Sequence, residues 1–155
     1  MWQIGVWERS DELSGQVAHM VRAACALVRC GSHPAALSGR SYDLLVVSPF
    51  AAGWAGAGVL RCRTALVPGS RAALTRRLCA ERTVSYGTGG ANTITLSSLE
   101  GGRAMVAVQR SFPALGGETV ERQELPIPFR EGGAPELLLA LAGARLLLGG
   151  GPAGP

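Results

Sequence analysis

Five residues that could bind a small polar ligand share one feature: each follows an apolar run that predicts a strand. They are Ser10, Asp11, Ser48, Gly69 and Ser70. In α/β proteins, ligands bind outside the carboxyl ends of parallel strands. The sequence therefore predicts a binding site there, with hydroxyl groups, one carboxylate and a glycine to contact a ligand. These residue types do not define a reaction.

The residues needed for several catalytic mechanisms are missing. The chain contains no lysine, so a P-loop lysine, a Schiff-base lysine and a lysine general base are all excluded. A serine hydrolase would need His19 or His33 with Asp11 or Asp43, and the spacing supports no such set. Ser48 also lacks the Gly-x-Ser-x-Gly frame of a nucleophile elbow. We predict no catalytic residue, and the protein is expected to be a non-enzyme.

The cysteines do not form a metal-binding pattern. No pair has Cys-x-x-Cys spacing, which zinc sites commonly show. Their apolar neighbours predict buried free thiols and no metal. The four are Cys25, Cys30, Cys62 and Cys79.

Two polar segments have simple structural interpretations. The run 87–90, Gly-Thr-Gly-Gly, leads into a strand instead of a helix, so it predicts a turn and not a phosphate loop. Glu118, Glu121 and Glu124 alternate with other polar residues, as on a solvated strand face.

Composition narrows the class of protein. The 155 residues suit one domain, and 47% of them are hydrophobic. The net charge of +4 comes from scattered arginines, and aromatic residues make up only 5%, which does not favour nucleic-acid binding. The longest apolar stretch, 137–148, is shorter than the roughly 20 residues of a spanning helix. Residues 1–8 resemble no secretion signal, so the expected location is the cytoplasm, without membrane contact or cofactor.

Strands and helices are predicted to alternate in the first half of the chain. Continuous apolar runs are typical of strands buried on both faces of a parallel sheet, and apolar spacings of three and four residues are typical of helices. The predicted strands are 2–7, 42–47, 63–67 and 83–86, and the predicted helices are Leu13 to about Arg29 and Ser70 to Ala80.

The second half has a different pattern. Glycine turns separate three extended pieces within about 92–128, which predicts a three-stranded antiparallel meander. Pro135 suits the first position of a closing helix, 136–148, before a tail at 150–155. We therefore expect one α/β domain over 1–149, with a parallel core sheet flanked by helices and the meander appended.

This order of elements resembles the central, ATP-binding domain of the Mur ligases, which extend peptidoglycan precursors in bacteria. The similar segments in the second half are the strand end 84–87 (Val-Ser-Tyr-Gly), the step 125–128 (Leu-Pro-Ile-Pro) and the alanine-rich helix 137–144. The segment 63–70 and the helix after it also match in order. Ile4-Gly5-Val6 and the helix 16–24 resemble the strand and helix that flank the family's P-loop.

The phosphate-binding loop of that family is absent here. The family has Gly-Thr-x-Gly-Lys-Thr, whereas this chain has Trp-Glu-Arg-Ser-Asp-Glu-Leu-Ser at 7–14. Carboxylates at this place would repel a triphosphate. The family's His-Asn step is likewise replaced by Arg-Glu-Gly-Gly at 130–133. The resemblance implies a shortened domain that has lost nucleotide binding and acts as an interaction or regulatory module.

Two alternatives stay open at this level. One is a small-ligand binder or enzyme that uses the carboxyl ends of the parallel strands. The other is self-association through an apolar loop around Phe50 and Trp54.

Overall fold

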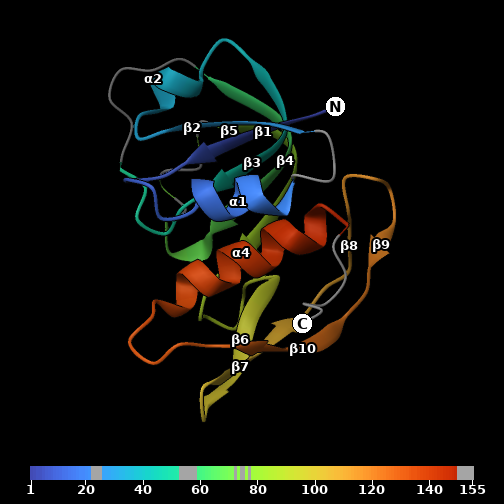
Figure 1. Cartoon of the computed structure of the whole chain (residues 1–155). Helices are drawn as coiled ribbons and strands as arrows, with labels where there is room; N and C mark the ends of the chain where they lie inside the picture. Colours follow the sequence, from blue (N-terminus) through green and yellow to red (C-terminus); the bar gives the residue numbers. More distant parts are fainter. Residues whose placement is uncertain (22–25, 53–58, 72, 74–75, 77, 150–155) are drawn as a thin grey trace.

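The computed structural model (Figure 1) describes residues 1–21, 26–52, 59–71, 73, 76 and 78–149. Eight of its strands form one sheet, in the order β10-β7-β6-β5-β4-β3-β1-β2, and β8 pairs with β9. The elements are β1 (Trp2–Trp7), α1 (Ser14–Met20), β2 (Ala26–Gly31), α2 (Pro34–Leu37), β3 (Ser41–Val47), β4 (Leu60–Pro68), a 3-10 turn (Gly69–Arg71), β5 (Leu78–Tyr86), β6 (Ile94–Glu100), β7 (Arg103–Val108), β8 (Phe112–Pro113), β9 (Thr119–Val120), β10 (Gln123–Pro128) and α4 (Pro135–Leu147).

The first five strands are parallel. Four of them, β1, β3, β4 and β5, were predicted, whereas β2 was not. β1 lies in the middle of them, paired with β2 on one side and β3 on the other. The order β2-β1-β3-β4-β5 is one of the two common orders of doubly wound sheets. In such sheets β2 is added on one side of β1 and β3 on the other, so the order of the strands reverses between β1 and β3. A ligand is expected at that point.

The meander continues this sheet. β6 starts where β5 ends, joined to it by the single pair Tyr86–Ile94, and β7 and β10 then add antiparallel strands. The predicted α/β class with a mostly parallel sheet and an antiparallel part is therefore confirmed. The predicted meander is β6, β7 and β10, which extend the main sheet and pack under α4.

The first predicted helix is too long. α1 ends at Met20, and Ala26–Gly31 form β2, which pairs with β1 over six residue pairs. The segment Ala-Leu-Val at 26–28 satisfies a helical spacing and also reads as a short apolar strand. Pairing with the free edge of β1 selects the strand over the helix. Residues 22–25 lie outside the described residues.

The second predicted helix is also wrong at its end. Leu78 to Ala80 belong to β5, where they pair with Leu60 to Cys62 of β4. The early part of β4 was not predicted because its residues alternate: Arg61 and Arg63 are exposed, whereas Leu60, Cys62 and Thr64 are buried. Ser70 lies in a 3-10 turn and caps no helix among the described residues.

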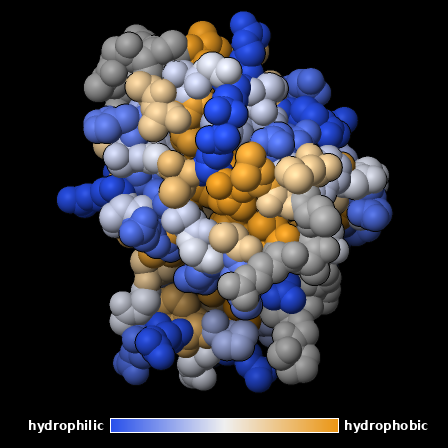
Figure 2. Space-filling model, turned by 45° about the horizontal axis from the view of Figure 1, so that its top comes forward, coloured by the Kyte–Doolittle hydropathy of each residue, from blue (hydrophilic) through white to orange (hydrophobic). Residues whose placement is uncertain are grey.

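The two faces of the sheet are covered differently. α1 and α4 lie side by side on one face (Figure 1), and their apolar residues pack on Ile4, Val46 and Leu66 of the strands below. The other face is buried around Trp7, with α2 contributing Leu37. On the face of the molecule shown in Figure 2, apolar surface gathers in the middle and has hydrophilic residues around it.

The closing helix is confirmed and packs closely on the sheet. Pro135 lies at its start, and seven of its residues are buried. A Cβ atom on Gly143 would lie 2.9 Å from Leu66 Cδ1 and 3.1 Å from Ile94 Cδ1, so a larger residue here would require these two side chains to shift. No helix within the described ranges is long and apolar enough to cross a membrane.

Candidate functional site

The carboxyl ends of β1 and β3 meet at the point where the sheet order reverses. The backbone N–H of Ser48, just after β3, donates a 2.8 Å hydrogen bond to the carbonyl oxygen of Trp7, the last residue of β1. The loop between β1 and α1 starts here, with Glu8. This is the place where a doubly wound sheet would hold an anionic ligand.

The carboxylate of Glu12 occupies the middle of that loop. Its Oε1 accepts hydrogen bonds from the backbone N–H of Arg9 and from the hydroxyl of Ser48, both at 2.8 Å. Its Oε2 accepts from the backbone N–H of Ser10 at 2.7 Å and from the Ser10 hydroxyl at 3.2 Å. Glu12 therefore receives the donors that the loop would otherwise offer to a bound anion.

These hydrogen bonds hold Glu12 in its charged form. Burial by itself would raise the pKa of Glu12, because it removes water from the carboxylate. The backbone N–H groups of Arg9, Glu12 and Ser10, together with the Ser48 hydroxyl, outweigh that effect and lower the pKa from 4.5 to about 2. The loop therefore carries a permanent negative charge at neutral pH.

A second carboxylate of the same loop is buried more deeply. Glu8 is 2% exposed, and its Oε2 accepts hydrogen bonds from the backbone N–H groups of Leu13 and Ser14 at 2.9 and 3.0 Å. These two donors lie where α1 begins, and free N–H groups at a helix start commonly bind phosphate. In this chain a side chain of the protein satisfies them.

A small cavity opens beside this loop, at the carboxyl ends of β1 and β2. Its volume is about 210 Å³, below the range of about 300–1,000 Å³ typical of small-molecule pockets. The cavity is lined by Glu8, Arg9, Ser10, Asp11, Cys30, Gly31 and Ser32.

The predicted site residues divide into two groups. Ser10, Asp11 and Ser48 come from the two strand ends just described: Ser10 and Asp11 line the cavity, and Ser48 is fully buried against Glu12. Gly69 and Ser70 follow β4 and are exposed. A Cβ atom on Gly69 would lie 2.0 Å from Asn92 Oδ1, so the side chain of Asn92 fills this position.

The acidic residues at 8–12 are visible in the sequence, but the hydrogen-bond partners of Glu8 and Glu12 are not. Both lie in a polar stretch that reads as a solvated loop, and glutamate is rarely buried. The available signal was their position between a strand and a helix, where a nucleotide-binding loop would have glycine and lysine.

The glycine-rich run 87–90 is part of a turn held by side chains. Asn92 Nδ2 donates to the carbonyl of Gly89 at 2.8 Å, and Gln109 Nε2 donates to the carbonyls of Gly90 and Asn92 at 2.8 and 2.6 Å. These contacts agree with the turn predicted there.

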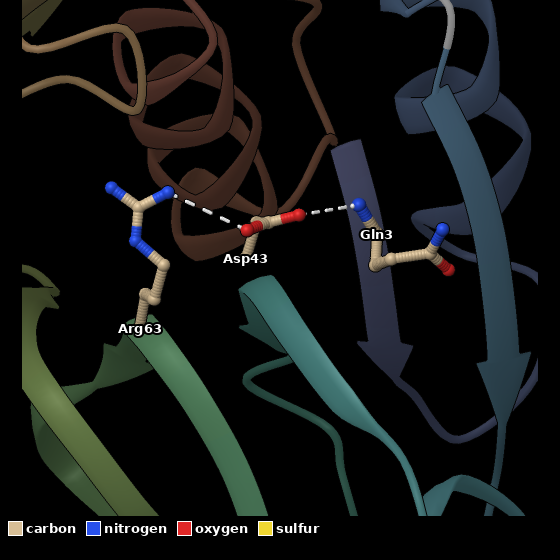
Figure 3. A network of polar contacts seen from close by, with 3 residues as sticks. All are labelled: Gln3, Asp43 and Arg63. Carbon is tan, nitrogen blue, oxygen red and sulfur yellow. Dashed lines mark hydrogen bonds and ion pairs between the residues drawn. The ribbon is translucent and has the colours of Figure 1, made fainter. Parts of the chain in front are cut away.

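A separate polar network lies near the amino ends of the strands (Figure 3). Asp43 Oδ2 accepts a 2.8 Å hydrogen bond from the backbone N–H of Gln3, and its Oδ1 lies 3.5 Å from Arg63 Nη1. The Arg63 guanidinium also lies 6.0 Å from the ring centroid of Trp2. This network joins β1, β3 and β4 and is remote in the fold from the loop at 8–12, so we assign it a structural role.

The thiols differ from the prediction that all would be buried. Cys62 is buried, and burial, followed by the proximity of Cys79 and Glu81, raises its pKa to about 12. Cys30, on the edge strand β2, and Cys79, near the start of β5, are free and exposed. Within the described ranges, no group of three or more His, Cys, Asp or Glu side chains could hold a metal ion. Cys25 lies outside those ranges.

No known protein family, curated protein or solved structure shows significant similarity to this chain.

Proposed function

We propose that this protein is a non-catalytic relative of the Mur-ligase central domain that has lost nucleotide binding and acts as an interaction or regulatory module. One observation carries the proposal. The loop that would bind phosphate has its donors taken by the chain's own carboxylates, Glu8 and Glu12.

Charge supports the same interpretation. A triphosphate at this loop would have to displace two carboxylates from short hydrogen bonds and would then remain beside their negative charges. Asp11 adds a third carboxylate to the loop, against one arginine, Arg9. Like charges at close range disfavour such binding, all the more where water is partly excluded.

Nucleotide titration tests the proposal. ATP with magnesium is added to ¹⁵N-labelled protein up to millimolar concentration, and the amide resonances of residues 8–14 and 48 are followed. We expect no saturable shift of these resonances. Saturable binding at millimolar concentration or below would refute the proposal.

A double variant tests whether the two carboxylates are the cause of the expected absence of nucleotide binding. In Glu8→Ala/Glu12→Ala the loop donors lose their internal acceptors, so weak phosphate binding at these amides is expected to emerge. Asp11→Asn serves as the matched control, because it removes a charge from the same loop and leaves the acceptors Glu8 and Glu12 in place.

A second candidate function rests on the 210 Å³ cavity. Its carboxylates, Glu8 and Asp11, outnumber its single cation, Arg9, so it would suit a small cationic or hydroxylated ligand. Ethanolamine is a suitable probe. Saturable shifts at Ser10, Cys30 and Ser32 that Asp11→Asn weakens would favour this function, whereas uniform or absent shifts would exclude it for this ligand class.

A further inference from the structure

We infer that the outer edge of β2 pairs with β2 of a second copy of this chain. β2 is the last strand of the eight-stranded sheet, and within the described residues no strand pairs with its far side. This inference goes beyond the proposed function and does not depend on the loss of nucleotide binding.

The direction of the β2 backbone groups follows from one hydrogen bond. The carbonyl of Gly31 accepts from the N–H of Glu8, which follows β1, so Gly31 points its backbone groups toward β1. The N–H and C=O groups of one strand residue point to the same side, and the side alternates along the strand. Ala26, Val28 and Cys30 therefore present their backbone groups outward.

The opposite edge of the sheet is protected against such pairing. The N–H of Phe129 donates to the carbonyl of Gly102 in the turn before β7, so by the same alternation Pro126 and Pro128 of β10 point outward. Proline has no N–H to donate, and proline on an edge strand prevents pairing with another chain.

The β2 edge has no such protection. Its outward residues Ala26, Val28 and Cys30 are all uncharged and have backbone N–H groups. Leu27, between them, leaves 40% of its surface exposed. An edge strand with these properties is a template for another strand.

The sequence of β2 fits a second copy of itself. In a two-fold antiparallel pair centred on Val28, that residue faces its own copy and Ala26 faces Cys30 of the second copy, so every outward residue finds a partner. Leu27 then lies opposite Arg29, whose aliphatic stem can cover it. Centring the pair on Arg29 would instead place two like charges opposite each other, which is unfavourable.

Cross-linking tests the predicted register. Residues that exchange hydrogen bonds across an antiparallel pair have Cα atoms about 5.5 Å apart, within reach of a disulfide. We expect Val28→Cys, with Cys30 and Cys79 replaced by serine, to form a covalent dimer under mild oxidation. The same background without Val28→Cys is the control. No covalent dimer above that background would overturn the inference.

Mass measurement gives a second, independent readout. The parent protein should show a concentration-dependent species of twice 16.0 kDa by sedimentation or light scattering. Val28→Lys should abolish it, while Glu124→Lys on the protected β10 edge should not. A parent protein that stays monomeric at millimolar concentration would overturn the inference. So would a dimer that survives Val28→Lys, because its interface would then lie elsewhere, for example around Phe50.

Discussion

The carboxylate of Glu12 accepts a 2.8 Å hydrogen bond from the hydroxyl of Ser48, joining the loop after β1 to the end of β3. The two residues are 36 positions apart in the chain. The contact closes the carboxyl end of the sheet at the point where its strand order reverses.

The charge of Glu12 should stabilise the fold over a defined range of pH. Its pKa is lowered from 4.5 to about 2, so its contribution is fully present above about pH 4.5 and is lost as the pH falls toward 2. Solvent screening of this partly exposed group limits the contribution to about 1 kcal/mol. Glu12→Gln should therefore lower the free energy of unfolding by about that amount at pH 7 and by progressively less below pH 4. Urea unfolding across this range measures it; a difference independent of pH would contradict it. Asp11→Asn is the control.

Removal of the Ser48 hydroxyl should affect stability through Glu12. Ser48→Ala loses the bond to Glu12 and the acceptor for the N–H of Phe50, 3.1 Å away, at a cost of about 1–2 kcal/mol. In a double-mutant cycle with Glu12→Gln, the two losses should be less than additive by at least about 0.5 kcal/mol. Strict additivity would mean that the two side chains do not interact in solution.

The buried carboxylate of Glu8 should be more costly to lose than Glu12. Glu8→Ala leaves the N–H groups of Leu13 and Ser14 without their acceptor, and a buried unsatisfied donor costs about 1–3 kcal/mol. Glu8→Gln keeps a carbonyl oxygen as acceptor and should lose less. Hydrogen exchange at Leu13 and Ser14 reports the contact directly. Unchanged protection of these amides in Glu8→Ala would show that water or another group replaces the carboxylate.

Two glycines in helices should respond in opposite ways to alanine. At Gly143 the added Cβ would lie about 3 Å from Leu66 and Ile94, so Gly143→Ala should destabilise the protein by about 1–3 kcal/mol. At Gly15 of α1 no atom lies within 4 Å of the added Cβ, so Gly15→Ala should stabilise by up to about 1 kcal/mol. Thermal unfolding of both variants measures the contrast. Equal responses would mean that α4 is not held close to the sheet.

The sequence by itself determined the class of the fold. Continuous apolar runs such as 42–47, glycine turns in 92–128 and Pro135 before an apolar stretch are local signals, and the structure has β3, the meander and α4 at those places. These signals are reliable because each restricts residue type locally. A strand buried on both faces takes apolar residues, a tight turn favours glycine, and the first position of a helix tolerates the missing N–H of proline.

Only the tertiary structure decided how the pieces pair. Ala26 to Gly31 are a strand because β1 had an open edge beside them, and Leu78 to Ala80 are a strand because β4 extended further than its apolar run. A short segment can satisfy helical and extended patterns together, and its partner then selects between them.

The contacts within the candidate site were likewise decided by the tertiary structure. Sequence position placed Ser10, Asp11 and Ser48 at strand ends and placed carboxylates where a phosphate loop would be. It did not reveal that Glu12 reaches Ser48, because that contact depends on β1 and β3 lying side by side in the sheet. It also did not reveal that Glu8 binds the start of α1, because that contact depends on how the short loop between β1 and α1 folds back. The absence of lysine follows from the sequence alone. The contacts of Glu8 and Glu12 with backbone N–H groups and with Ser48 are set by the fold.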